Sequence, residues 1–283
     1  MPTTLLTGLP RSGTTLLCAL LNELPDAIAL VEPPMRLMST SDPSQAINKI
    51  DVFITESRQR ALKQGLMLTR SHAGAIPDNL FGPPDGTTTL RAGISEISLI
   101  PVGKALSEDF HLFIKHPGGF TALAAQLSER YPLFAFVRNP LAALASWQCV
   151  DIPPHYGRAS GAERFDRSLS ARLDLVEDRI ERQVELLSWF LSVYGRLGAD
   201  RVLRYEDLVA DPAGTLARLH SRTGEFRRAI SEYPIEERYP AVDFARLAAA
   251  LRAIVPLARP FYPDFEDVLD RHTPRPRATS ACA

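Results

Sequence analysis

A glycine-bracketed loop near the start of the chain has the residue types that bind a phosphate-like anion. The loop is Gly8-Leu-Pro-Arg-Ser-Gly-Thr-Thr15, with a short apolar run before it and leucines at helical spacing after it. A turn of this kind between a strand and a helix directs backbone N–H groups into one concavity, at the positive end of the helix dipole. The pattern predicts an anion cradle made by the amides of Ser12, Gly13, Thr14 and Thr15, with Arg11 as its cation.

The loop departs at one position from the loop that binds nucleoside triphosphates. Gly8 and Gly13 have the right spacing, but Thr14 stands where that motif requires a lysine. A loop whose cation has moved inward to Arg11, and which continues as Ser-Gly-Thr-Thr, resembles the 5′-phosphosulfate loop of the sulfotransferase family. The resemblance implies 3′-phosphoadenosine-5′-phosphosulfate (PAPS) as sulfuryl donor, 3′-phosphoadenosine-5′-phosphate (PAP) as product, and no metal.

Two later segments carry the same resemblance. Arg138 follows the apolar run Leu133-Phe-Ala-Phe-Val137, and Ser146 lies eight residues further on, in a helix that Pro140 can open. Family members hold the donor's 3′-phosphate with such a pair, for which a guanidinium fork and a hydroxyl are suited. Tyr205, in Arg204-Tyr-Glu-Asp-Leu, resembles a family tyrosine that helps to hold the adenine end. The three motifs extend to about residue 224.

Two residues are candidates for the general base that takes the acceptor's proton. Glu32 follows a short apolar run, and a carboxylate at the C-terminal end of a strand faces the ligand crevice of an open parallel sheet. Sulfotransferases that act on tyrosine, and several bacterial ones, carry a catalytic glutamate at this place, so we predict Glu32 as the base. Its structural alternative is an ion pair with Arg36 or Arg11.

Cytosolic members of the family use a histidine after the third main strand instead. That resemblance makes His116 the alternative base, and Lys115 beside it a candidate to assist at the sulfuryl group. The basic, glycine-containing loop with which cytosolic members also grip the 3′-phosphate has no counterpart in this sequence. Candidates to replace it are Arg227, Arg228 and Arg238.

Apolar runs alternate with amphipathic segments, which predicts an α/β fold. We expect one domain over residues 1–271, with a central, mostly parallel sheet flanked by helices, similar to P-loop proteins and sulfotransferases, and a disordered tail over 272–283. The expected strands are 3–7, 29–31, 112–115, 133–137 and 201–205. The expected helices are 14–24, 120–129, 140–149, 173–197, 212–223 and 244–254. Residues 35–110 are rich in Pro and Gly and are expected to be irregular; in the family this region shapes the acceptor pocket.

Composition narrows the functional classes. The chain has 283 residues, 45% hydrophobic side chains, a net charge of −1 and a pI near 6.6, which is typical of a globular protein and gives no basic footprint for nucleic acid. No apolar run reaches the length of a membrane span, and the first strand begins so early that no leader is expected, which favours a cytoplasmic protein. The three cysteines lack disulfide or metal spacing.

The acceptor is not specified by these motifs. An Ala- and Arg-rich, Lys-poor composition favours a bacterial protein and therefore a small-molecule or carbohydrate acceptor. The sequence does not decide whether the chain forms a homodimer.

Two other functional classes explain part of the sequence pattern. A P-loop kinase accounts for the loop and the parallel sheet but needs a lysine and an acidic Mg²⁺ ligand. A nucleotide-binding protein without sulfuryl-transfer activity needs no base.

Overall fold

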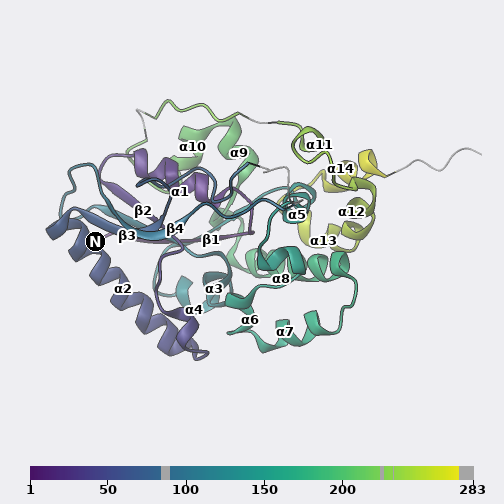
Figure 1. Cartoon of the computed structure of the whole chain (residues 1–283), viewed down its shortest axis with the longest axis horizontal. Helices are drawn as coiled ribbons and strands as arrows, with labels where there is room; N and C mark the ends of the chain where they lie inside the picture. Colours follow the sequence, from purple (N-terminus) through teal and green to yellow (C-terminus); the bar gives the residue numbers. More distant parts are fainter. Residues whose placement is uncertain (84–89, 224–225, 232, 274–283) are drawn as a thin grey trace, which may run out of the picture.

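A five-stranded parallel sheet forms the centre of the protein (Figure 1). The structure is a computed structural model, and it describes residues 1–83, 90–223, 226–231 and 233–273. The predicted α/β fold with a parallel sheet is confirmed. The strand order is β2-β5-β1-β6-β7. The bounds are β1 Thr3–Gly8, β2 Ala27–Val31, β5 His111–Lys115, β6 Leu133–Val137 and β7 Val202–Arg204.

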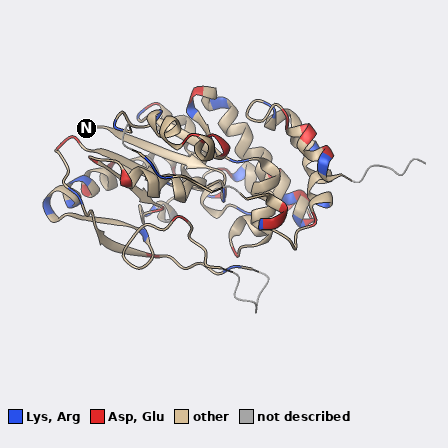
Figure 2. Cartoon of the chain, turned by 90° about the horizontal axis from the view of Figure 1, so that it is seen from above, with Lys and Arg blue, Asp and Glu red and all other residues tan. Residues whose placement is uncertain are grey.

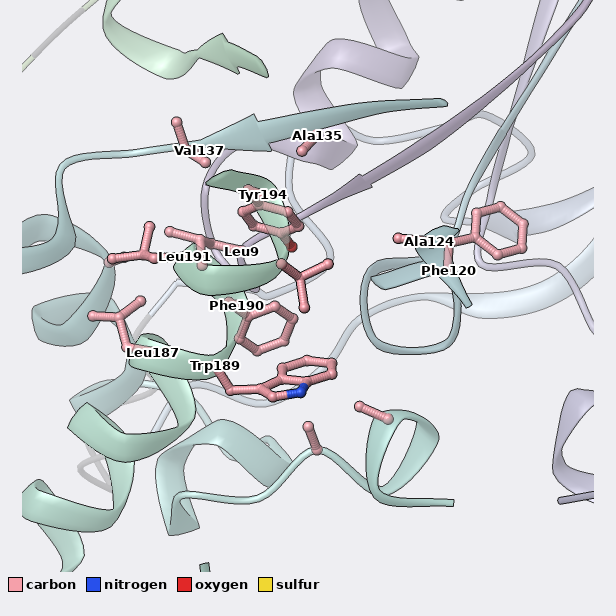
Figure 3. Packing of buried hydrophobic residues seen from close by; sticks show 14 of the residues in the cluster. Leu9, Phe120, Ala124, Ala135, Val137, Leu187, Trp189, Phe190, Leu191 and Tyr194 are labelled. Carbon is pink, nitrogen blue, oxygen red and sulfur yellow. The ribbon is translucent and has the colours of Figure 1, made fainter. Parts of the chain in front are cut away.

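Both faces of the sheet are covered, and each face has its own apolar core. Neighbouring residues of a strand point to opposite faces, so Leu5 belongs to one core and Leu6 to the other. On one face lie α1 (Thr14–Glu23), α9 (Tyr205–Ala210) and α10 (Pro212–Ala217). On the other, Figure 3 shows Phe190, Leu191 and Tyr194 packing beneath Ala135 and Val137 of β6.

The long helix expected over residues 173–197 is two helices. These are α7 (Arg167–Asp174) and α8 (Arg179–Leu197). The side chain of Asp178 accepts hydrogen bonds from the N–H groups of Ile180 and Glu181, so it caps the start of α8. An N-cap residue has a non-helical backbone, so the chain is not helical at Asp178 and a new helix begins within the segment that was predicted to be one continuous helix.

The expectation that residues 35–110 are irregular is wrong for much of the segment. It contains α2 (Pro43–Gln64) and an antiparallel hairpin of β3 (Leu66–Ser71) with β4 (Glu96–Pro101). The signals were present in the sequence. Asp42 caps α2 and Pro43 is its first residue, while Gly65 ends it with a positive φ of 65°. The hairpin covers β2, where the Val31 N–H donates to Thr69 Oγ1.

The other elements complete the layers around the sheet. Figure 2 shows that positively and negatively charged residues are interspersed along the outer helices. The predicted helix at Pro140 is confirmed as α5, with Asn139 as its cap. Helix α14 includes His272, and residues 274–283 of the predicted tail lie outside the described residues. The remaining bounds are α3 Pro117–Ala122, α4 Ala124–Ser128, α5 Pro140–Gln148, α6 Ser160–Glu163, α11 Ile235–Arg238, α12 Phe244–Leu251, α13 Val255–Ala258 and α14 Phe265–His272, with 3₁₀ turns at Leu37–Ser39, Pro153–Tyr156, Ala199–Arg201 and Arg252–Ile254.

The cap of α2 gives a prediction about stability. We expect Asp42→Ala to lower the free energy of unfolding by about 1 kcal/mol, because two N–H groups of the first turn lose their acceptor. Urea denaturation measures the change. The control is Ser128→Ala, which removes an exposed polar side chain at the end of α4 that caps no helix N-terminus. An unchanged denaturation midpoint for Asp42→Ala would show that the cap does not stabilise α2.

Candidate functional site

The predicted site residues lie along one edge of the sheet, in the order of its strands. Glu32 follows β2, Lys115 ends β5, the glycine loop follows β1, Arg138 follows β6 and Tyr205 follows β7. All of these segments line one cavity of about 320 Å³. Because parallel strands point the same way, their carboxyl ends form a common crevice, where open α/β sheets bind ligands. The structure thus gathers residues that are up to 173 positions apart in sequence, from Glu32 to Tyr205.

The glycine loop leaves the start of α1 open toward this cavity. Gly13 has a φ of 92°, and no side chain of the described residues caps the first turn of the helix. A Cβ atom at Gly13 would lie 2.6 Å from the ring of Tyr205, so both the backbone conformation and the space require glycine. Thr14 and Thr15 line the cavity. Uncapped amides at a helix start, with the dipole behind them, favour an anion.

Ser12 does not take the predicted part in the cradle. Its backbone N–H donates to the Leu9 carbonyl at 3.1 Å, and its hydroxyl donates to the Phe136 carbonyl at 2.9 Å. The side chain is fully buried and does not line the cavity. Both donors are therefore already used to fix the loop against β6, and the structure assigns Ser12 a structural role.

Arg11 points along the loop toward α5. Its Nε donates to Ser146 Oγ at 3.1 Å and its Nη1 to Asn79 Oδ1 at 2.8 Å, while the guanidinium lies 4.7 Å from the centre of the Phe81 ring. Burial lowers the pKa of Arg11 to about 10, so the side chain stays charged at neutral pH. Ser146 is predicted to help bind the 3′-phosphate, and in this structure its hydroxyl accepts from Arg11.

Arg138 and Ser146 meet around a tyrosine that the motifs did not include. An N–H of Arg138 lies 3.5 Å from the hydroxyl of Tyr239, which also interacts with Ser146. Burial raises the pKa of Tyr239, but the charges of Arg138, Arg238 and Arg11 and the bond with Ser146 outweigh burial and lower it. The only sequence signal for Tyr239 was its neighbour Arg238.

Tyr205 joins the two anion sites. Its ring lies next to Gly13, and the guanidinium of Arg138 lies 4.7 Å from the ring centre. Such stacking holds an arginine without using its N–H donors. Tyr205 and Arg138 are therefore neighbours, and the tyrosine ring forms part of the cavity wall.

The three arginines that could replace the missing basic loop differ in whether they lie at the cavity. Arg238 lines the cavity. Arg228 forms ion pairs with Glu23 and Asp78, so its charge is already used. Arg227 donates to the Phe226 carbonyl. Of these three residues, Arg238 is the one that the structure places at the site.

Glu32 is held by two cations, neither of which was expected. Lys115 Nζ bonds to Oε1 at 2.5 Å, and Arg70 Nε lies 3.4 Å from Oε2. The predicted alternative, a pair with Arg36 or Arg11, is not formed. Burial raises the pKa of Glu32, but the charge and hydrogen bond of Lys115 outweigh it and bring the pKa to about 2. The residue has a positive φ of 43°, a strained conformation for a side chain other than glycine.

His116 uses the lone pair that a general base would need. Its Nδ1 accepts a hydrogen bond from the Gly119 N–H at 3.2 Å. A neutral imidazole that accepts at Nδ1 carries its proton on Nε2, so the other nitrogen is a donor. Burial also lowers the pKa of His116, which keeps the ring neutral. The ring lines the cavity as a hydrogen-bond donor.

The far wall of the cavity comes from two segments. Asp78, Asn79, Leu80 and Phe81 belong to the region that was expected to shape an acceptor pocket. The other segment, residues 152–161, was not expected and contributes Ile152, Pro153, Pro154, Ala159, Ser160 and Gly161. Nothing in the sequence marked this second segment, because its place depends on the packing of α6 against α3.

Within the described residues, no group of three or more His, Cys, Asp or Glu side chains is arranged to hold a metal ion. A search of the same residues for a helix with the length and apolar character to cross a membrane finds none.

No family model and no curated protein matches the chain. Among solved structures, the chain is similar to the sulfotransferase from Alicyclobacillus acidocaldarius, at 16% identity and a TM-score of 0.34 over 90% of this chain and 96% of that one. The chain is also similar to the sulfotransferase STF1 from Mycobacterium tuberculosis H37Rv, at 13% identity and a TM-score of 0.36, over 89% of this chain and 76% of that one. A third similar structure is the sulfotransferase domain from the Curacin biosynthetic pathway, at 13% identity and a TM-score of 0.32, over 84% of this chain and 78% of that one.

The pairing of Glu32 predicts a pH dependence of stability. Its carboxyl group has an ordinary pKa of 4.5 and a pKa of about 2 in the folded protein, so folding favours the ionised form. This stabilisation is fully present above pH 4.5 and is lost as the pH falls toward 2. The difference in unfolding free energy between wild type and Glu32→Gln, measured in urea, should be largest at neutral pH and shrink below pH 4.5.

Glu129→Gln is the control, because Glu129 is exposed and has no ion pair among the described residues. A difference between wild type and Glu32→Gln that stays constant from pH 7 down to acid would contradict the lowered pKa.

Proposed function

We propose that this protein transfers a sulfuryl group from PAPS to a hydroxyl group of a small-molecule or carbohydrate acceptor. The observation that carries the proposal is the arrangement of two anion sites and a carboxylate along one edge of the sheet. PAPS carries anionic groups at both its 5′ and 3′ positions, so it needs two such sites. The uncapped start of α1 is suited to the 5′-phosphosulfate, and Arg138 with Ser146 to the 3′-phosphate.

The donor then lies across the crevice from β7 toward β2. Tyr205 offers a ring face at the nucleotide end, and Arg238 adds a cation to the wall there. Binding of a 3′-phosphate between Arg138 and Ser146 requires the hydroxyl of Tyr239 to yield or to join as a donor. The sulfuryl group would extend beyond the loop toward Lys115 and Glu32, the two residues at the other end of the cavity.

The proposed reaction is an in-line displacement at sulfur. The acceptor oxygen forms a bond to sulfur while the bond from sulfur to the 5′-phosphate oxygen breaks, and the acceptor's proton goes to a base. The negative charge that develops on the leaving phosphate faces the amides of Gly13, Thr14 and Thr15. Arg11 reaches the same phosphate if its guanidinium exchanges Ser146 and Asn79 for the ligand. Fixed amides and arginine can stabilise this charge without a metal.

Glu32 is the base that the geometry favours over His116. A carboxylate with a lowered pKa is ionised at neutral pH and can accept a proton, whereas Nδ1 of His116 already accepts from Gly119. The pairing with Lys115 makes Glu32 a weak base in this state. A move of the Lys115 ammonium toward the sulfuryl oxygens would remove that charge from Glu32 and raise its pKa, because loss of a nearby opposite charge favours the neutral form.

The donor assignment predicts the binding of PAP. Calorimetry should show tight binding of PAP to wild type and weak binding to Arg138→Ala, because the 3′-phosphate loses a charged hydrogen-bond donor, a loss of about tenfold or more. ATP with Mg²⁺ should bind far more weakly. Arg196→Ala removes an exposed arginine of α8 outside the cavity and should leave PAP binding unchanged. A preference for ATP–Mg²⁺, or indifference to Arg138, would support a kinase-like protein instead.

The base assignment predicts a separation of turnover from binding. Glu32→Gln should lower the rate of PAP release with a panel of phenolic and sugar acceptors by about 10²- to 10⁴-fold, the range for loss of a general base, while PAP affinity is retained. His116→Gln keeps an N–H donor and should lose much less. The opposite ranking of the two variants would assign the base to His116, and unchanged turnover in both would point to a binding protein.

A further inference from the structure

A second concave surface lies outside the catalytic cavity, along the outer side of α2. It is a groove of about 760 Å³ between α2, residues Pro34 to Arg36 and Leu68 of β3. Figure 1 shows α2 at the edge of the molecule, beside the β3–β4 hairpin. We refer to this surface as the α2 groove.

Helix α2 has two distinct sides. One side is buried in the core through residues such as Ile47, Ile50 and Ile54. The opposite side lines the groove with residues spaced three or four apart, which places them in one stripe along the helix. Those residues are Gln45, Asn48, Lys49, Val52, Glu56 and Arg60, with the buried Phe53 at the boundary between the two sides. From Gln45 to Arg60 the stripe is about 22 Å long, at 1.5 Å per residue.

The α2 groove carries positive charge that the protein does not neutralise. Arg36, Lys49 and Arg60 line it and form no ion pair with any described residue, and Glu56 is the single acidic residue of the lining. Nη1 of Arg60 is buried and has no hydrogen-bond partner within the part of the chain that the structure describes. A buried guanidinium nitrogen without an acceptor is costly. An anionic ligand would supply the missing acceptor and balance the excess charge.

The remaining lining suits a sugar chain better than a simple anion. Gln45, Asn48 and Glu56 offer amide and carboxylate groups that can bond to hydroxyls. Met35 and Phe53 are almost fully buried and, with Leu68, provide an apolar floor. Sugar rings have hydroxyl edges and apolar C–H faces, and the groove presents partners for both along its length.

The groove leads toward Glu32. Pro34 lies two residues after Glu32, so their Cα atoms are at most about 7 Å apart. Leu68 and Arg70 are alternate residues of β3 and therefore share one face of the hairpin. Leu68 lines the groove, and Arg70 contacts the Glu32 carboxylate. A chain bound along α2 can thus reach the proposed base.

We propose that the α2 groove binds an acidic oligosaccharide and directs one of its hydroxyls to Glu32. The cations Lys49 and Arg60 bind its carboxylate or sulfate groups. The delivery of a hydroxyl rests on the proposed sulfotransferase function, whereas binding in the groove does not. The groove therefore determines acceptor specificity at a distance from the reacting atoms.

The test measures the affinity of the full-length protein for a fluorescent tetrasaccharide of alternating uronic acid and sulfated hexosamine, by anisotropy at physiological ionic strength. Lys49→Ala and Arg60→Ala should each weaken binding by about tenfold, the effect of losing one charged hydrogen bond. Arg196→Ala removes an exposed arginine of α8 that forms no ion pair with a described residue, and it should leave the affinity unchanged. Urea midpoints of the variants show whether each is folded.

Three results would overturn the proposal. These are equal binding of a neutral glucose tetrasaccharide, equal loss of affinity in Arg196→Ala, and equal binding of an acidic peptide of the same charge. PAP calorimetry on the same variants separates this proposal from the previous one, because PAP affinity should be unchanged by Lys49→Ala and Arg60→Ala. A different result would separate the two proposals: the protein binds the saccharide in a way that depends on Lys49 but does not bind PAP. That result would support saccharide binding in the α2 groove and contradict the proposed sulfotransferase function.

Discussion

The shape of the site depends on one carbonyl group, that of Phe136 in β6. Its oxygen accepts from the Leu9 N–H at 3.0 Å and from the Ser12 hydroxyl at 2.9 Å. A Cβ atom at Gly8 would lie 2.4 Å from the same oxygen. These contacts fix the loop to the neighbouring strand at its start and in its middle. The start of α1 can face the cavity uncapped because the loop is already held by bonds that do not involve a ligand.

Each of three charged groups of the site has a polar or aromatic partner within the protein. Arg11 bonds to Ser146 and Asn79, Arg138 lies against Tyr205 and Tyr239, and Glu32 is held by Lys115. Each cation therefore has an internal partner that a ligand oxygen can replace. Exchange of partners avoids leaving a desolvated charge unpaired at any stage, which is the costly state for buried ions.

The sequence was sufficient to predict the parts of the site that local patterns encode. The loop from Gly8 to Thr15 and the strand before Arg138 follow from apolar runs and turn residues that are contiguous in the chain. The partners of Arg11 and Glu32 could not be found in this way. Asn79 lies 68 residues from Arg11, and Lys115 lies 83 residues from Glu32. Such contacts depend on strand order and on the packing of α2 and the hairpin, which no local pattern specified.

The position of β1 in the sheet also constrains how the chain folds. β1 is the first strand in sequence, but its two neighbours are β5 and β6, whose paired residues begin at Leu112 and Leu133. During synthesis the glycine loop therefore leaves the ribosome long before the strands that hold it. The pairing of β1 closes loops of more than 100 residues and is expected to be slow. Until β5 has been made, β1 has no partner within the sheet, so Leu5 and Leu6, which are buried in the folded protein, lack the strand that β1 pairs with first along the chain.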